Sequence, residues 1–168
     1  MDYIYDAFIS YRHTQHDMII AEKLHKLLET YQIPSAIVKE GFPKSLKRIF
    51  RDREELPTAV SLSDSIKYAL ENSNYMIVIC STETPKSAWV EKEVQTFIEM
   101  GRQDKILTIL IEGTPQTSFP KPLLSIKNSP DIDISYMEDR KFALKELKRK
   151  NLHLIAQIID CDYHKLES

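Results

Sequence analysis

Glycine is scarce in this chain of 168 residues, which contains only Gly41, Gly101 and Gly113. A phosphate-cradling loop needs several glycines within a few positions, so the dinucleotide-binding fingerprint and the P-loop are both excluded. Cysteine is rarer still, with Cys80 and Cys161 alone. So few cysteines fit a reducing compartment, and we expect a cytoplasmic location.

An excess of charge and long apolar runs are missing as well. The formal net charge is −2, which argues against a strongly electrostatic partner such as nucleic acid. The longest aliphatic stretch ends at Ile111 and is too short to cross a bilayer, so no membrane contact is expected. With 42% hydrophobic and 29% charged residues, the composition is typical of one soluble globular domain.

Apolar strand patterns alternate with helical patterns along the chain. We expect strands at residues 5–10, 48–50, 75–80, 105–111 and 131–136. Helices are expected at about 18–31, 62–70 and 139–160, and one begins near Ser87; Asp17 is the expected N-cap of the first. Continuous apolar strands separated by helices predict an α/β fold with a parallel sheet that is covered on both faces.

The helix that begins near Ser87 carries the most informative pair of residues. Trp89, the only tryptophan, stands four positions before Glu93, so the two side chains are neighbours on one helix face. Glu93 lies at the edge of the apolar stripe of this helix, where a carboxylate is partly desolvated, as working carboxylates often are. The helix alone, however, favours an ordinary boundary glutamate.

Ligands of parallel α/β sheets bind at the carboxyl ends of the strands, which here brings together residues 10–13, 51–53 and 81–89. Arg12 is the best placed cation for a phosphate, because arginine binds phosphate through a planar fork. A surface ion pair of Arg12 with Asp52 or Glu54 is an equal alternative. His13 and His16 lack a strong third ligand nearby in the sequence, so no metal site is expected.

These segments resemble the motifs of TIR (Toll/interleukin-1 receptor) domains, most closely those of bacteria. The resemblance is carried by YDAFISYR at 5–12, by IFRDREELP at 49–57, which opens the so-called BB loop, and by SAWVEKE at 87–93. The last is similar to the helix with the catalytic glutamate of NAD-cleaving members. Thr58 replaces the glycine that usually follows the BB-loop proline in animal receptors, which weakens a reading as a receptor adaptor.

The resemblance spans about residues 3–160 and implies a flavodoxin-like three-layer fold with a central five-stranded parallel sheet. We therefore expect a TIR domain over residues 1–160. Residues 161–168 are expected to be a polar tail, or the start of a linker to a missing domain such as a fused sensor.

The resemblance also implies an NAD+ nucleosidase that cleaves the nicotinamide–ribose bond, with NAD+ as substrate and no cofactor. Products would be nicotinamide and ADP-ribose or a cyclic or otherwise modified ADP-ribose, and the biological role would be anti-phage defence. Glu93 would be the catalytic residue. The substrate-binding residues implied are Ser10, Tyr11, Arg12, His13 and Trp89.

Assembly is a further implication of the family. Arg53, Leu56 and Pro57 would form a loop that contacts a neighbouring TIR domain, and activity would depend on a homo-oligomer or filament. Two alternatives stay open: a non-catalytic TIR module for protein interaction and signalling, and an enzyme acting on another nucleoside bond, such as a deoxyribosyltransferase.

Overall fold

The computed structural model describes residues 2–56 and 61–167. Its strands are β1 (Tyr5–Ser10), β2 (Ile49–Arg51), β3 (Ser73–Cys80), β4 (Ile106–Leu110) and β5 (Ile132–Asp133). They form one parallel sheet in the order β2-β1-β3-β4-β5. The chain builds outward in one direction from β1 and in the other from β3, so the point where the strand order reverses lies between these two central strands.

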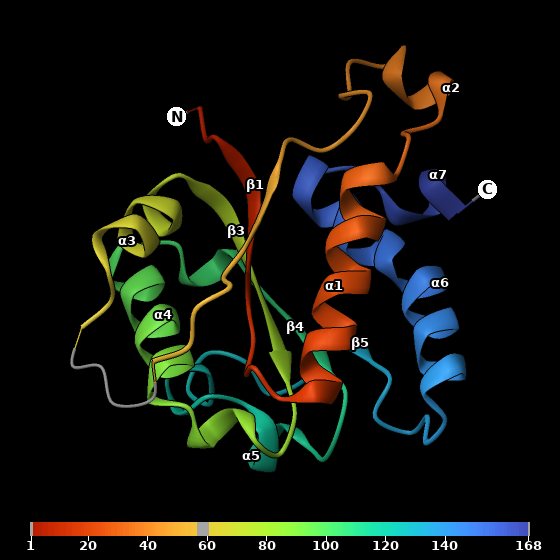
Figure 1. The fold of residues 1–168 in the computed structure, drawn as a ribbon. Helices are drawn as coiled ribbons and strands as arrows, with labels where there is room; N and C mark the ends of the chain where they lie inside the picture. Colours follow the sequence, from red (N-terminus) through yellow and green to blue (C-terminus); the bar gives the residue numbers. More distant parts are fainter. Residues whose placement is uncertain (1, 57–60, 168) are drawn as a thin grey trace.

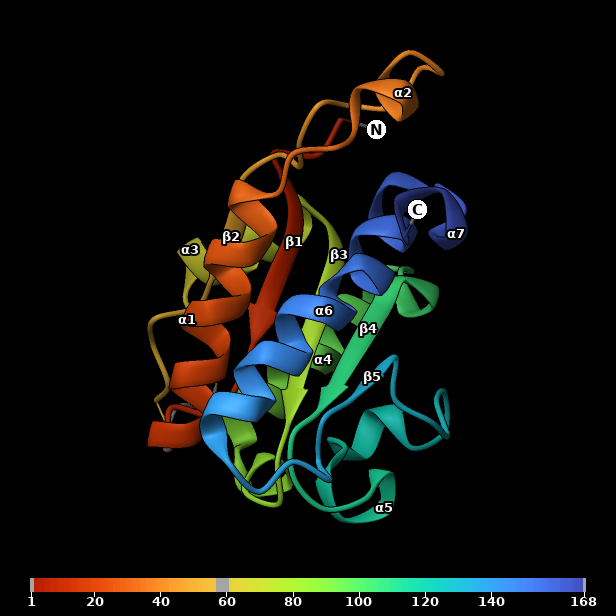
Figure 2. The ribbon, with the colours of Figure 1, turned by 90° about the vertical axis from the view of Figure 1, so that its right-hand side faces the viewer.

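Helices cover both faces of this sheet (Figures 1 and 2). On one face lie α1 (Gln15–Thr30) and α6 (Arg140–Ile159), and on the other lie α3 (Asp64–Glu71) and α4 (Ala88–Glu99). The shorter helices are α2 (Ser35–Val38), α5 (Pro115–Ser118) and α7 (Tyr163–Glu167), with 3-10 turns η1 (Thr84–Lys86), η2 (Gln103–Lys105) and η3 (Lys121–Leu123). The predicted flavodoxin-like α/β fold with a five-stranded parallel sheet is confirmed.

Alternation along the central strands supplies the two hydrophobic cores. Ala7 and Ile9 of β1 pack toward α1 and α6, whereas Phe8 between them packs toward α3 and α4. Strands that are buried on both faces read as continuous apolar runs, which is why the pattern of β1, β3 and β4 was visible in the sequence. This rigid centre holds the loops at the carboxyl ends of the strands.

The start of α1 differs from the prediction. The helix begins at Gln15 after the N-cap Thr14, so Asp17 lies within the first turn and is not the cap. Its carboxylate instead accepts hydrogen bonds from Thr14 Oγ1 at 2.8 Å and from Ser81 Oγ at 2.9 Å. The prediction was wrong because Asp17 has a buried partner, Ser81, which directly follows β3 and is far away in the sequence.

The end of the chain packs on the domain. Leu166 of α7 is 5% exposed and Cys161 is buried, and both belong to the core on the α1 and α6 face. The ring of Tyr163 stacks on His153 of α6 with 3.8 Å between centroids. The packing therefore continues past residue 160, where the end of the domain was predicted. No helix within residues 2–56 and 61–167 is long and apolar enough to span a membrane.

Candidate active site at the carboxyl edge of the sheet

The segments that follow β1, β2 and β3 meet at the carboxyl edge of the sheet, beside the first turns of α4. This edge is the lower one in Figure 1. Ser87 starts α4 by accepting a hydrogen bond from the Val90 N–H at 3.1 Å, which fixes the direction of the helix. Glu93 lies in the second turn of this helix and points toward the end of β1.

Glu93 is buried, with a relative exposure of 1%. Ser10 Oγ, at the end of β1, donates to Glu93 Oε1 at 2.7 Å. The other oxygen, Oε2, is buried and has no hydrogen-bond partner among the residues that the structure describes. Burial, together with the neighbouring Asp52 carboxylate, raises the pKa of Glu93 well above its ordinary value of 4.5. A buried carboxyl oxygen without a hydrogen-bond partner is costly and rare, which makes this position a candidate functional site.

Asp52, which was predicted at this edge within residues 51–53 but not named as a site residue, is the second buried carboxylate. It is 1% exposed and follows directly after β2. Its Oδ2 accepts the indole N–H of Trp89 at 2.7 Å, and its Oδ1 accepts the backbone N–H of Glu54 at 2.8 Å. Both oxygens of the Asp52 side chain are thus occupied by donors, and its proximity favours the protonated form of Glu93.

Trp89 lies one turn before Glu93, on the same side of α4 as predicted. The indole is 1% exposed and belongs to the core between α3, α4 and the sheet. In this conformation it presents no open aromatic surface, and its direct polar contact is with Asp52. Its predicted contact with a substrate stays a prediction.

Glu55, which was likewise not named as a site residue, joins three segments of the edge. Its Oε1 accepts the backbone N–H of His13 at 3.0 Å and lies 3.6 Å from Nε of Arg12. Its Oε2 accepts a hydrogen bond from Ser87 Oγ at 2.5 Å. The ion pair considered for Arg12 is thus made with Glu55, and not with Asp52 or Glu54. Through Glu55, the segment after β2 is fastened over the end of β1 and the start of α4.

The residues after β1 are brought together as predicted, although they differ in exposure. Ser10 and Tyr11 are buried, whereas Arg12 and His13 are partly exposed. The rings of Tyr11 and His13 stack at 4.6 Å, and His13 Nε2 lies 3.1 Å from the backbone oxygen of Asp52. Burial raises the pKa of Tyr11, which keeps its hydroxyl neutral. Arg12 also donates to the backbone oxygen of Glu83 at 3.1 Å.

Two of the three predicted assembly-loop residues can be placed. Arg53 and Leu56 are exposed, and the apolar side chain of Leu56 has a relative exposure of 52%. Pro57 lies outside the described residues. An exposed leucine beside the hydrogen-bonded Glu55 suits a contact surface, and its role in assembly stays a prediction.

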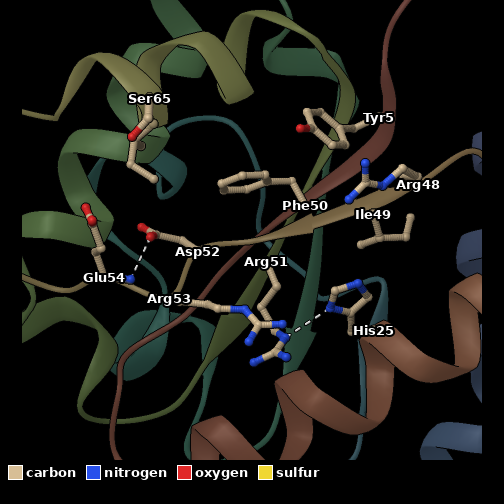
Figure 3. A pocket seen from close by; sticks show the side chains of 11 residues that line it. Tyr5, His25, Arg48, Ile49, Phe50, Arg51, Asp52, Arg53, Glu54 and Ser65 are labelled. Carbon is tan, nitrogen blue, oxygen red and sulfur yellow. Dashed lines mark hydrogen bonds between the residues drawn. The ribbon is translucent and has the colours of Figure 1, made fainter.

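A cavity of about 380 Å³ opens beside this cluster, along the outer edge of β2 (Figure 3). Asp52 lines it together with Phe50, Arg51 and Arg53, whereas Glu93 does not. The catalytic candidate is therefore closed off from the nearest open space. Within the described part of the chain, no three His, Cys, Asp or Glu side chains are grouped so that they would hold a metal ion.

Comparison with known proteins identifies the family of this chain. A family model described as a TIR domain matches residues 7–148. The chain belongs to the TIR-domain family. This TIR domain is 29% identical over 112 residues to the NAD(+) hydrolase ApTIR of an Actinoplanes species. The match covers 65% of the chain but 14% of that relative, so it spans a small part of a much longer protein.

One solved structure shows the same fold. The TIR domains of the activated Roq1 resistosome, which directly recognises the pathogen effector XopQ, superpose with a TM-score of 0.53. The superposition covers 86% of this chain and 98% of that one at 16% identity. The TIR domain of the Toll-related receptor TRR-2 of Hydra magnipapillata has a TM-score of 0.42 at 21% identity, covering 86% and 96% of the two chains. At this level of identity, the resistosome match shows the fold alone.

Proposed function

We propose that this TIR domain cleaves the nicotinamide–ribose bond of NAD+, with Glu93 as the catalytic carboxylate. The observation that carries the proposal is the buried carboxyl group of Glu93, held by Ser10 through one oxygen and without a donor at the other. It lies where the strand order reverses, which is where ligands of such sheets bind. The resemblance to a relative that is named an NAD(+) hydrolase supports the same chemistry.

In the proposed reaction the bond between the ribose C1′ and the nicotinamide nitrogen breaks, and its electron pair leaves with the nicotinamide. The ring, cationic in NAD+, departs neutral, while positive charge grows on the ribose. An ionised Glu93 stabilises this charge and holds the ribose hydroxyls. Water then adds to C1′ and loses a proton, giving ADP-ribose; capture by a nitrogen of the adenine gives a cyclic product instead. No cofactor is needed.

The reaction requires Glu93 to be reachable and ionised, and the closed arrangement opposes both. We propose that the segment from Asp52 to Leu56 moves away when a second TIR domain binds through Arg53, Leu56 and Pro57. Release of Glu55 from Arg12, His13 and Ser87 would open a path to Glu93. Arg12 would then be free to bind the NAD+ pyrophosphate through its planar fork. A homo-oligomer or filament is the active form in this proposal, and bacterial anti-phage defence is its role.

Nicotinamide release from NAD+ tests the proposal, measured over a range of protein concentrations. The variant Glu93→Gln keeps the size of the side chain and should lower release by about 10²-fold or more, because the developing charge loses its carboxylate. Glu91→Gln is the matched control, since Glu91 lies on the same helix and should leave release unchanged. Release per molecule should rise with protein concentration if assembly opens the site.

The other outcomes separate the alternatives. Equal release from the wild type and Glu93→Gln would mean that the wrong residue has been named. No release from the wild type, even when the protein is clustered on a surface, would favour the non-catalytic interaction module, which the closed state of Glu93 also suits. Cleavage of deoxynucleosides in preference to NAD+ would favour the deoxyribosyltransferase.

A further inference from the structure

Three arginines accompany β2, the strand at one open edge of the sheet. Arg48, Arg51 and Arg53 occur within six positions, in a molecule whose net charge is −2. None of their guanidinium groups lies within 4.0 Å of a carboxylate oxygen of residues 2–56 or 61–167. The positions without description between these ranges carry no acidic side chain. Positive charge is therefore concentrated here without a close ion pair, although Arg48 is near enough to Glu29 to help lower the pKa of that carboxyl.

The acidic side chains nearest to these arginines are committed to other groups. Glu29 Oε2 accepts the backbone N–H of Ile49 at 2.9 Å and lies 3.2 Å from His25 Nε2. The carboxylate of Asp52 is occupied by Trp89 and the Glu54 backbone. Glu54 directs its own carboxylate toward Ser65 and away from the arginine side chains (Figure 3). These carboxylates form no close pair with the three guanidinium groups, although Glu54 lines one of the adjoining cavities and Glu29 the other.

The side chains are arranged around open space. Two adjoining cavities of about 380 and 430 Å³ share the lining residues His25, Arg48, Ile49 and Arg53. Arg51 and Arg53 point in the same direction, toward His25 (Figure 3). Arg51 Nε donates to His25 Nδ1 at 3.0 Å, which fixes one of the two guanidinium groups in place. Two like charges directed into one cavity repel each other unless an anion lies between them.

The cavity combines this charge with an apolar wall. Tyr5, Phe50 and Ile66 line its other side, and the rings of Tyr5 and Phe50 meet edge to face at 5.4 Å. Its volume is in the range of small-molecule sites. Guanidinium forks suit phosphate oxygens, while aromatic and aliphatic side chains suit a flat ring. The positive charge is confined to β2 and the residues directly beside it, which disfavours a long nucleic acid.

We propose that this cavity binds a nucleoside phosphate, with Arg51 and Arg53 on the phosphate oxygens and Arg48, which lines both cavities, adding charge. The site is separate from the proposed catalytic one, because Glu93, Ser10 and Trp89 take no part in its lining. Asp52 is the residue that borders both: its side chain holds Trp89, and it lines the cavity.

Amide NMR titration of the full chain locates the ligand. The probes are ADP, inorganic pyrophosphate and adenosine. We expect ADP and pyrophosphate to shift the amide signals of residues 48–53 and of His25, and adenosine to leave them in place. Shifts confined to residues 10–13 and 87–93 would place the ligand beside Glu93 and overturn the proposal. Absence of shifts with millimolar ADP would overturn it as well.

Variants then identify the residues responsible. Arg53→Gln removes a side chain that makes no hydrogen bond or ion pair within the described chain, so the fold should be retained, which a thermal melt checks. ADP should bind about tenfold more weakly to this variant. Arg149→Gln, on the exposed surface of α6, makes the same change of charge and should bind ADP as the wild type does. Equal weakening by both variants would indicate a general charge effect and contradict the site.

A further variant separates this site from the proposed activity. Glu93→Gln should bind ADP with unchanged affinity, even if it releases no nicotinamide. A loss of ADP binding in Glu93→Gln, with binding kept in Arg53→Gln, would reject the cavity. An inactive wild-type enzyme that still binds ADP through Arg53 would leave the cavity standing and reject only the NAD+ reaction.

Discussion

Two of the three buried carboxyl groups at the carboxyl edge of this sheet lie on opposite sides of it. Asp17 of α1 is 2% exposed and Glu93 of α4 is 1% exposed, and burial raises the pKa of both. Both oxygens of Asp17 accept hydrogen bonds, from Thr14 and Ser81. Glu93 has Ser10 as its donor and a second oxygen with no partner among the described residues. The two groups are equally buried but differ in hydrogen bonding. Both oxygens of Asp17 are bonded within the fold, whereas one oxygen of Glu93 is left without a partner among the described residues.

Charge near the two groups sharpens this difference. The hydrogen bonds from Thr14 and Ser81 oppose the effect of burial on the pKa of Asp17. For Glu93, the neighbouring Asp52 adds to the effect of burial. We therefore expect substitutions at the two positions to change stability in opposite directions.

The largest effect on stability is expected at Asp17. The variant Asp17→Ala should lower the free energy of unfolding by about 2–3 kcal/mol, because the buried hydroxyl of Ser81 and the partly buried hydroxyl of Thr14 lose their acceptor. Urea unfolding at pH 7 measures this change, and Asp17→Asn, which keeps one acceptor, should lose less. A neutral result for Asp17→Ala would remove the structural role given to this residue.

The dependence on pH should distinguish Glu93. With a folded pKa above 4.5, Glu93 keeps its proton in the native state while the unfolded chain releases it, so its contribution to stability falls as pH rises from 4.5 through the raised pKa. Glu93→Gln should therefore gain stability over the wild type by up to about 1.4 kcal/mol per pH unit in that window. Unfolding in urea at pH 5, 6 and 7 measures the gap; a gap that stays constant with pH would contradict the raised pKa.

The indole contact with Asp52 is the next test of the Glu93 side. Trp89→Phe keeps the apolar ring but removes the donor to Asp52 Oδ2, and should lower the free energy of unfolding by about 1.5 kcal/mol. A double-mutant cycle with Asp52→Asn isolates this pair, because packing losses cancel in the coupling energy. A coupling energy near zero would mean that the 2.7 Å contact makes no contribution to the free energy of unfolding.

The smallest effect on stability is expected at Glu55. Its contact with Arg12 is partly exposed, so Glu55→Gln should cost about 0.5 kcal/mol. If Glu55 fastens the closed form, nicotinamide release at low protein concentration should nevertheless increase in this variant. An unchanged or lower rate, with the fold intact, would show that another contact closes the site.

Local patterns predicted much of the fold. The strands β1, β3 and β4 and the helices α1, α4 and α6 follow from apolar periodicity, which depends on nearest neighbours along the chain. The predicted last strand, 131–136, shortens to Ile132–Asp133, because alternation alone does not decide how far an edge strand stays paired. Asp17 was misplaced as a cap, since its partner Ser81 lies 64 positions away.

The site was predicted in part for the same reason. Trp89 and Glu93 were visible because one helical turn separates them. Asp52 and Glu55 were not named as site residues, because their partners Trp89 and His13 lie 37 and 42 positions away. Only the strand order, which sets the end of β2 beside that of β1, turns those two acids inward.

The position of the chain ends has a mechanical consequence. The N-terminal start of β1 and helix α7 both lie at the upper edge of the molecule in Figure 1, opposite the edge that carries Glu93. A tether attached to either end would hold the domain at the edge opposite Glu93 and leave the edge that carries Glu93 free. Crowding such domains on a common support would raise their effective concentration toward one another by orders of magnitude without obstructing a single residue of the site.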